Sequence, residues 1–204
     1  MVDTKAHWEQ VYATRKPHEV GWFQAYPEIP LRLIAATGVA KSEAIIDVGG
    51  GASNLVDALL ENGYSNVTVL DLSAAALEAT QARLGAASNQ VTWLVADITR
   101  FVPGQQYALW HDRAVFHFLT DAADRRLYIE AARSALPSGG HLIVATFALD
   151  GPAQCSGLDV VRYSPESLSH EIGTGFALEE SFGALHITPS QGKQSYTFCR
   201  FVRK

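Results

Sequence analysis

Basic residues, cysteines and long apolar runs are all scarce in this chain. Its 204 residues include 16 Lys and Arg against 21 Asp and Glu, which gives a formal net charge of −5. Because binding to nucleic acids and anionic membranes is driven by clustered basic residues, this balance argues against both as main partners. No apolar stretch approaches the roughly 20 residues that span a bilayer. The first residues also lack the hydrophobic core of a signal peptide.

Only two cysteines are present, and they lie far apart in the sequence, at Cys155 and Cys199. Reduced thiols in a cytoplasmic protein are the simplest interpretation of this pattern. The 7 histidines show no spacing typical of metal ligands, so we expect no catalytic metal. The length favours a single domain over residues 1–204, with residues 1–40 as an N-terminal arm.

A loop of three glycines follows the first clear strand pattern. Residues 44–48 are mostly apolar and β-branched, and Gly49, Gly50 and Gly51 lead from them into a segment rich in leucine and alanine. This order predicts a strand, a loop and a helix. Glycines lack the Cβ atom that keeps a ligand away from the backbone, so we expect a ligand to lie against this loop.

Strands and helices alternate along the rest of the chain. Strand patterns cover residues 66–71, 91–97, 107–112 and 141–147, and helices are expected at residues 74–84, with Ser73 as N-cap, and 121–136. The chain ends with a helix that begins near Ser164 and two strand patterns, residues 176–187 and 194–202. The fold class predicted is α/β: a single-domain, doubly wound, mostly parallel seven-stranded sheet with a C-terminal antiparallel hairpin.

Four strand ends carry polar residues. Asp71, Asp97 and the pair His111 and Asp112 each follow an apolar strand, as the glycine loop does. Ligands of open α/β sheets bind at the carboxyl ends of the strands, where the strand order reverses. We therefore expect all these features to line one crevice.

The spacing of the acids indicates a nucleoside ligand. Asp71, followed by Leu72, lies 20 residues after Gly51, the distance at which an acid reaches the two hydroxyls of a ribose. Asp97 is placed to meet the exocyclic amine of an adenine, with Ile98 beside the ring. Each acid could instead cap the helix that follows it.

A dinucleotide cofactor fits the loop less well. The pattern G-x-G-x-x-G requires a glycine where Asn54 stands. Tyr12 and Lys16 match a Tyr-x-x-x-Lys spacing used by short-chain dehydrogenases, but they precede the glycine loop instead of following the fourth strand. We interpret that match as chance.

The motifs together resemble a class I S-adenosylmethionine-dependent methyltransferase over essentially the whole chain. Those that carry the resemblance are residues 47–51, Asp71, Asp97, residues 107–119, residues 139–141 and the final hairpin. The resemblance implies a Rossmann-like methyltransferase fold with S-adenosyl-L-methionine as cofactor, the glycine loop lying against its methionine part. The family often has a third glycine where Ser53 stands here, a mild departure because serine is small and could cap the helix.

The N-terminal arm resembles a subgroup that includes protein-lysine methyltransferases. Residues 7–12 and 20–23 carry this similarity. It implies that several side chains fold over the cofactor or lie near it, namely Trp8, Tyr12, Trp22 and Arg113. A sulfonium is attracted to aromatic faces, although the arm rings could instead simply cover one face of the sheet.

Methyl transfer is an in-line displacement that needs a general base only when the acceptor arrives protonated. His117 and His111 are the candidate catalytic bases, but His117 could be a packed histidine and His111 could merely stabilise a loop. Arg113 could hold a carboxylate of the cofactor or of the acceptor.

Acceptor-side candidates lie in the loop formed by residues 148–163, which we expect to cover the mouth of the crevice. They are Cys155, Arg162 and Tyr163. A lone cysteine is more often an inert apolar residue than a reactive one.

Three functions remain open. A methyltransferase with a small-molecule acceptor is favoured because no inserted domain is present to grip a macromolecule, whereas the arm suggests a protein-lysine methyltransferase. The third is a non-catalytic nucleoside-binding module. The oligomeric state and the acceptor atom are not indicated by the sequence.

Overall fold

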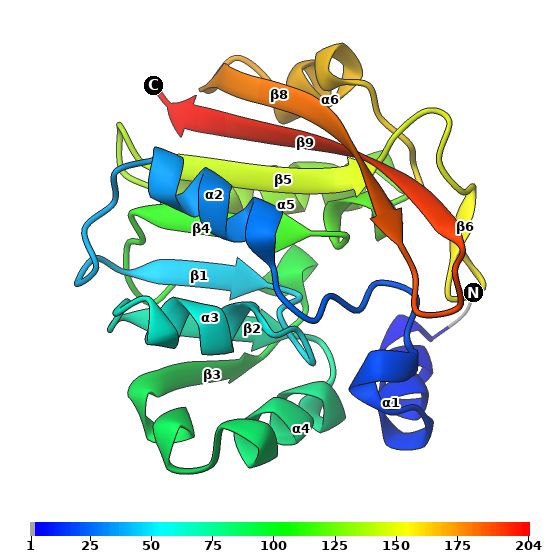
Figure 1. Ribbon diagram of the computed structural model, residues 1–204. Helices are drawn as coiled ribbons and strands as arrows, with labels where there is room; N and C mark the ends of the chain where they lie inside the picture. The colour runs from blue at the N-terminus through cyan, green and yellow to red at the C-terminus, as the bar shows by residue number, and fades with distance from the viewer. Residues whose placement is uncertain (1–2) are drawn as a thin grey trace.

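The computed structural model describes residues 3–204, and its centre is one seven-stranded sheet (Figure 1). The strand order is β3-β2-β1-β4-β5-β9-β8, in which β1 to β5 are parallel and β9 and β8 are antiparallel to their neighbours. The strands are β1 (Ile45–Val48), β2 (Val67–Asp71), β3 (Val91–Val95), β4 (Leu109–Arg113), β5 (His141–Phe147), β8 (Phe176–Ile187) and β9 (Lys193–Arg203). The predicted parallel sheet with a C-terminal hairpin is confirmed.

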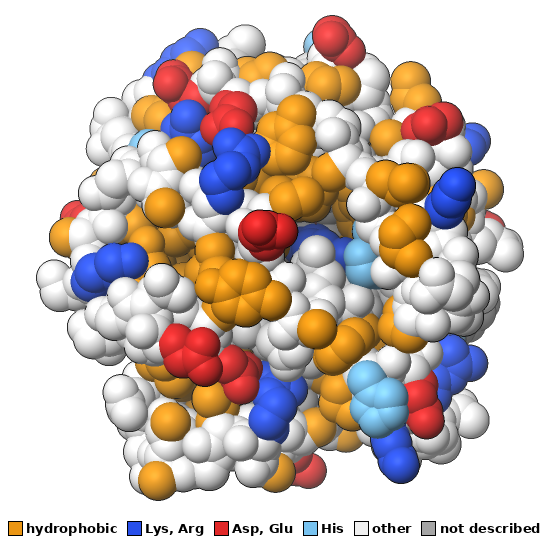
Figure 2. Space-filling model, in the orientation of Figure 1, with side chains coloured by type: hydrophobic (Ala, Val, Ile, Leu, Met, Phe, Trp, Pro, Cys, Tyr) orange, Lys and Arg blue, Asp and Glu red, His pale blue; other side chains and the backbone are white. Residues whose placement is uncertain are grey.

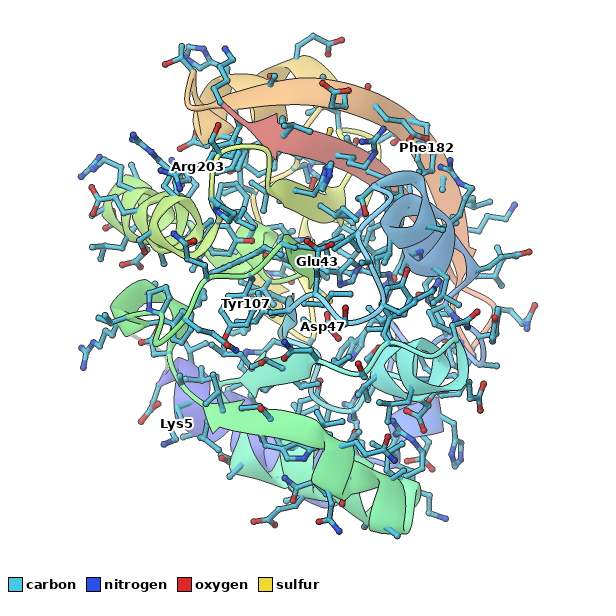
Figure 3. All side chains as sticks on the ribbon, turned by 90° about the vertical axis from the view of Figure 1, so that its left-hand side faces the viewer. Lys5, Glu43, Asp47, Tyr107, Phe182 and Arg203 are labelled. Atoms are coloured by element: carbon cyan, nitrogen blue, oxygen red, sulfur yellow. The ribbon has the colours of Figure 1, made fainter. Side chains whose placement is uncertain are left out.

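Helices cover both faces of the sheet, as the view along the strands in Figure 3 shows. One apolar core lies between the sheet and α2 (Glu28–Ala36), α3 (Leu55–Glu61) and α4 (Ala74–Leu84), and the other lies under α5 (Ala122–Ala135) and α6 (Pro165–Ile172). Strand residues alternate between the cores, with Leu109 on the α3 side and Trp110 on the α5 side. The doubly wound arrangement is therefore confirmed.

Two strands are shorter than their sequence patterns. The N–H of Tyr107 donates to the carbonyl of Ala135 at the end of α5, at 2.8 Å, so this residue lies before β4, which begins at Leu109. Asp97 leaves β3 to cap the 3-10 helix η3 (Ile98–Arg100). In both cases a hydrogen bond at a helix end replaces the continuation of the strand. The last carbonyls of α5 and the first N–H groups of η3 lack partners within their own helices, and Tyr107 and Asp97 supply them.

The strand order reverses at β1, which lies between β2 and β4. The loop after β1 and the loop after β4 run in different directions there. A crevice therefore opens between them at the carboxyl ends of the strands. The first helix of the arm, α1 (Thr4–Thr14), lies on this side of the molecule, toward which the arrowheads of the parallel strands point in Figure 1. The 3-10 helix η1 (Pro17–Glu19) continues the arm. The turn between the short strands β6 (Gln154–Cys155) and β7 (Leu158–Asp159) contacts α1, because His7 and Ser156 form a hydrogen bond. The arm is thus placed over the crevice.

Within residues 3–204, the helices are all too short or too polar to cross a membrane. Figure 2 shows the face that carries α2 and α3, on which acidic and basic side chains are interspersed. That face offers no extended surface of one charge sign to a polyanion.

Candidate functional site

A cavity lies at the carboxyl ends of the parallel strands, next to α1. Most of the predicted site residues line it: Trp8, Tyr12, Trp22, Gly49, Asp71, Leu72, Asp97, Ile98, Arg113 and Cys155. The sequence did not predict several further lining residues, among them Thr4, Thr99, Phe118, Leu119 and Asp124. The fold therefore gathers the arm, the strand-end acids and the loop after β4 around one space.

Asp71 ends β2 with a carboxylate that lines this cavity and is nearly buried, at 7% exposure. One of its oxygens accepts a hydrogen bond from the N–H of Ser73 at 2.8 Å. Burial raises the pKa of Asp71 to about 7, while the Ser73 N–H opposes that rise. Hydroxyl donors of a ligand in the cavity would stabilise the charged carboxylate further.

Asp97, which follows β3, both caps a helix and lines the cavity, the two roles that the sequence left as alternatives. Asp97 caps η3, because its Oδ1 accepts hydrogen bonds from the N–H and the hydroxyl of Thr99 at 2.9 and 2.7 Å. It also lines the cavity together with Ile98. Asp124, from the first turn of α5, lines the cavity where α5 packs against η3. Acidic oxygens beside an apolar side chain suit an aromatic base with an exocyclic amine.

The glycine loop is packed tightly against its own strands. Gly49 adopts a positive φ of 69°. A Cβ on Gly50 would collide with the carboxylate of Asp47, and one on Gly51 would lie 2.5 Å from an oxygen of Asp71. Of the three glycines, Gly49 lines the cavity, Gly50 lines a smaller neighbouring cavity, and Gly51 lies behind Asp71. Packing alone thus requires glycine at the last two positions.

Three rings of the arm meet a fourth from the 3-10 helix η4 (Phe116–Phe118). The indole of Trp8 lies 5.5 Å from that of Trp22 and 5.2 Å from the ring of Phe118, both edge to face, and 6.2 Å from Tyr12. All four rings line the cavity. The arm rings therefore do more than cover a face of the sheet.

Hydrogen bonds fasten the arm to the scaffold at several points. The carboxylate of Glu9 accepts from the N–H groups of Ala74 and Ala75 at 2.7 and 3.2 Å, and from the hydroxyl of Ser73 at 3.1 Å. The amide of Asn54 donates to two carbonyls of the arm at 3.0 and 3.2 Å. Sequence reasoning missed Glu9, because its partners lie 64 to 66 positions away and no local pattern connects them.

Asn54, not Ser53, is the N-cap of α3, but Ser53 still contributes a hydrogen bond at the start of this helix. Its hydroxyl accepts a hydrogen bond from the N–H of Leu55, the first residue of α3, at 3.1 Å. The small Ser53 therefore gives the first N–H group of α3 a hydrogen-bond partner without a third glycine.

Arg113 ends β4 between the arm and the C-terminal hairpin. Its Nη1 donates to the carbonyl of Trp22 at 2.9 Å, and its guanidinium carbon lies 4.9 Å from the ring centre of Tyr196. Its Nε and Nη2 are buried and have no hydrogen-bond partner within residues 3–204. Arg113 and Gly49 both line the two cavities. The Nε and Nη2 donors of a guanidinium at this position suit a ligand carboxylate.

His111 and Asp112 do not face one crevice, which corrects the expectation. His111 donates from Nδ1 to Asp47 at 2.7 Å and lines the smaller cavity, and Figure 3 shows Asp47 near the centre of the molecule. Asp112 lies on the opposite face, since successive strand residues alternate. It accepts hydrogen bonds from two N–H groups of the following loop at 2.8 and 3.0 Å and from the hydroxyl of Tyr128 at 2.7 Å. Asp112 thus stabilises the loop.

His117 lies behind the cavity wall, contrary to the expectation that it faces the acceptor. Its side chain is fully buried between the rings of Phe118 and Phe147, at 4.5 and 4.7 Å, and its Nδ1 accepts a hydrogen bond from the N–H of Phe147 at 3.3 Å. Burial, together with the nearby Arg113, lowers the pKa of His117 to about 3. This geometry favours the packed-histidine interpretation over the general base.

Only one of the three acceptor-side candidates reaches the cavity. Cys155 lines it, and burial raises the pKa of this thiol to about 11, so it is protonated at neutral pH. Arg162 donates to two carbonyls of its own loop at 3.0 and 3.2 Å. Tyr163 is buried, with its ring 5.7 Å from that of Phe116. Arg162 and Tyr163 thus hold the loop in place, because backbone and core contacts turn them away from the cavity.

The described chain, residues 3–204, has no group of three or more His, Cys, Asp or Glu side chains that could hold a metal ion. The polar groups of the site are instead a guanidinium and several carboxylates spread along the cavity.

Residues 45–140 match a family described as a methyltransferase domain. A structure described as "Conversion of a Disulfide Bond into a Thioacetal Group during Echinomycin Biosynthesis" is 19% identical, with a TM-score of 0.79, over 98% of this chain and 92% of that one. The N-methyltransferase NodS from Bradyrhizobium japonicum WM9 is 17% identical, with a TM-score of 0.72, over 99% of both chains. A SAM-dependent methyltransferase from Anabaena variabilis ATCC 29413 is 15% identical, with a TM-score of 0.74, over 100% of this chain and 96% of that one. Curated protein sequences include no significant match.

The cavity fits S-adenosyl-L-methionine. The unpaired donors of Arg113 match its carboxylate, Asp71 matches a ribose, and the aromatic rings match a sulfonium. Residues 45–140 thus match a methyltransferase domain, and the chain shares the fold of S-adenosyl-L-methionine-dependent methyltransferases.

Proposed function

We propose that the enzyme transfers a methyl group to a small-molecule acceptor. The observation that carries this proposal is the cavity beside the arm, in which Trp8 from α1 and Phe118 from η4 meet at 5.2 Å. A space closed by aromatic rings suits a small molecule, because a folded protein or a duplex could not enter it without displacing the arm. The chain would act as one domain, with residues 1–40 as the cover of the site.

The cofactor contacts follow from the lining residues. Asp71 would accept hydrogen bonds from the ribose hydroxyls, with Leu72 beside it, and Asp97 would accept one from the adenine amine, with Ile98 near the ring. Arg113 would donate to the carboxylate of the methionine part, and the backbone of Gly49 would lie along that part. Support comes from the position of all five side chains and of Gly49 around one cavity.

The bound cofactor supplies an activated methyl carbon. The residues of this chain bind and orient the reactants and exclude water, so positioning provides most of the rate. Trp8, Tyr12 and Trp22 favour positive charge in the cavity. His117 accepts a hydrogen bond from the N–H of Phe147 and packs against the ring of Phe118. It thereby keeps Phe118, which lines the cavity, in position.

His111 acts at a different point from His117. Its hydrogen bond to Asp47 joins β4 to β1 just below the glycine loop. We assign both histidines positioning roles, since neither lines the main cavity.

A protein-lysine methyltransferase is the second candidate. The arm residues Trp8, Tyr12 and Trp22 line the cavity as that resemblance implies. A lysine side chain is long enough to enter such a space while its backbone stays outside. Incorporation of labelled methyl groups only into macromolecules of a cell extract would favour this candidate over the first.

Calorimetric titration with S-adenosylmethionine, S-adenosylhomocysteine and NAD, carried out in parallel, tests the assignment. We expect micromolar binding of the first two and none of NAD. Binding of NAD alone would contradict the methyltransferase mechanism and assign Asp71 to a dinucleotide ribose. An acceptor screen with small thiols, thioethers, amines and carboxylates then tests the small-molecule proposal.

A further inference from the structure

Four aromatic rings enclose part of the cavity. Trp8 packs against Tyr12, Trp22 and Phe118. The ring centres of Tyr12 and Trp22 lie 6.2 Å apart in an edge-to-face arrangement. Rings from α1, from the arm before α2 and from η4 thus line one space together. We call Trp8, Tyr12, Trp22 and Phe118 the aromatic cage. Cages of this kind bind quaternary ammonium groups, because a cation is attracted to each ring face.

The side chains of the cage itself offer no proton acceptor. Within residues 3–204, the titratable side chains that line the cavity are Tyr12, Asp71, Asp97, Arg113, Asp124 and Cys155. Tyr12 and Cys155 already hold their protons, since burial raises the pKa of both groups. Arg113 is permanently charged.

The three carboxylates lie outside the cage itself, and two of them already have partners. Asp71 lies close enough to Tyr12 to raise the pKa of that phenol beyond the effect of burial, but it accepts a hydrogen bond from Ser73, and Asp97 accepts two from Thr99. Asp71 and Asp97 follow β2 and β3, and Asp124 lies where α5 packs against η3. His117 and His111 lie outside this cavity, and each holds another residue through Nδ1. An acceptor held by the cage that loses a proton on methylation would therefore find no base among the cage residues and would depend on a carboxylate outside the cage.

On the basis of the proposed methyltransferase function, we propose that the acceptor atom has a lone pair but no proton, as in a thioether or a tertiary amine. The product is then a permanent cation, a sulfonium or a quaternary ammonium, and the aromatic cage surrounds it. The cage stabilises the charge that appears on the acceptor, as well as the charge that the cofactor brings.

The electron balance of this step needs no further reagent. The lone pair of the acceptor forms the new bond to the methyl carbon, while the bond from that carbon to the cofactor sulfur breaks and its electron pair stays on that sulfur. The positive charge moves from one sulfur to the acceptor atom. No proton is released, so no base is required.

Binding of product-like cations tests the proposal without turnover. Calorimetry would compare choline, its sulfonium analogue (2-hydroxyethyl)dimethylsulfonium and its uncharged isostere 3,3-dimethylbutan-1-ol, each added to the complex of the protein with S-adenosylhomocysteine. We expect both cations to bind at least about tenfold more tightly than the isostere. In the complex with S-adenosylmethionine the preference should disappear, because a positive charge is already present.

Matched variants locate the effect. Phe118→Leu should remove most of the preference for the cations while affinity for S-adenosylhomocysteine changes less than about threefold. Phe182→Leu makes the same change in a ring that stacks on Phe198 at 5.4 Å, away from the cavity, and should leave the preference intact. If Phe118→Leu does not fold, Phe118→Tyr with its altered ring electrostatics gives a second comparison.

The possible failures can be told apart. Equal or tighter binding of the uncharged isostere would overturn the cationic-product proposal, and so would a preference that survives in the Phe118 variant. Either result would mean that the aromatic cage does not bind a cationic product and serves the cofactor alone. Absence of S-adenosylhomocysteine binding by the wild-type protein would instead contradict the proposed function itself.

Discussion

The two ends of the cavity are built in different ways. At the acidic end, Asp71 ends β2 and Asp97 follows the adjacent strand β3, and the ladder of the sheet sets their positions. At the ring end, Trp8 and Phe118 come from segments far apart in the chain and meet only because the arm is fastened to the scaffold. The acidic end should therefore be as rigid as the sheet, whereas the ring end can open when the arm detaches. Affinity for the cofactor should depend mainly on the first, and access to the site on the second.

The largest effect is expected at the acidic end, from Asp71→Ala. Loss of the two ribose hydrogen bonds to a charged acceptor, about 3–6 kcal/mol, should weaken the binding of S-adenosylhomocysteine by roughly two to four orders of magnitude. Calorimetry measures this, with a thermal melt to show that the variant is folded. An unchanged dissociation constant would mean that the ribose lies elsewhere.

The pH dependence of affinity sharpens the same assignment. Because burial raises the pKa of Asp71 to about 7, the free protein loses this proton only near neutrality, and the hydroxyl donors of a ribose favour the charged form. Affinity for S-adenosylhomocysteine should rise about tenfold from pH 6 to pH 8. Titrations across this range should show a flat profile for Asp71→Asn. A profile that is equally steep in the variant would assign the effect to another group.

The same shift in pKa affects stability with the opposite sign. The folded ligand-free protein holds this proton more tightly than the unfolded chain, whose Asp71 titrates near pH 4. The contribution of Asp71 to the free energy of unfolding should therefore fall as pH rises from about 4 to 7. Denaturant unfolding of wild type and Asp71→Asn at both pH values would show the difference.

A smaller effect is expected at the arm, from Glu9→Ala. This change removes three hydrogen bonds between α1 and the start of α4, so the arm should open more often. Dissociation of S-adenosylhomocysteine, measured by stopped flow, should become about fivefold faster. Glu19→Ala is a matched control, because this glutamate accepts its hydrogen bond within the arm, from the N–H of Lys16. Equal rates in both variants would show that Glu9 is not the fastening point.

The smallest effect on cofactor binding is expected from His117→Asn. The histidine is buried behind Phe118 and does not line the cavity, so affinity for S-adenosylhomocysteine should change by less than about threefold. Turnover should fall through the displaced ring. A general base would give a different result, the loss of an ionisation from the pH profile of turnover in the variant.

Local sequence patterns were sufficient for most of the fold. Ser73 as a cap before the helix at residues 74–84 depends on neighbours in the chain, and the structure confirms it. The expectation that His111 and Asp112 share a crevice was wrong for a reason that the sequence already contained. Adjacent residues of a strand point to opposite faces, so only one of the two could lie beside Arg113.

The sequence by itself determined the order of strands and helices, the tight glycine loop and the acids at the strand ends. These depend on residues close together in the chain and on the rule that parallel strands end at one edge. Only the tertiary structure decided that Arg162, Tyr163 and His117 turn away from the cavity, that Phe118 completes the aromatic cage and that Glu9 fastens the arm. Those outcomes depend on packing and hydrogen bonds between segments distant in the chain, whose relative positions no local pattern records.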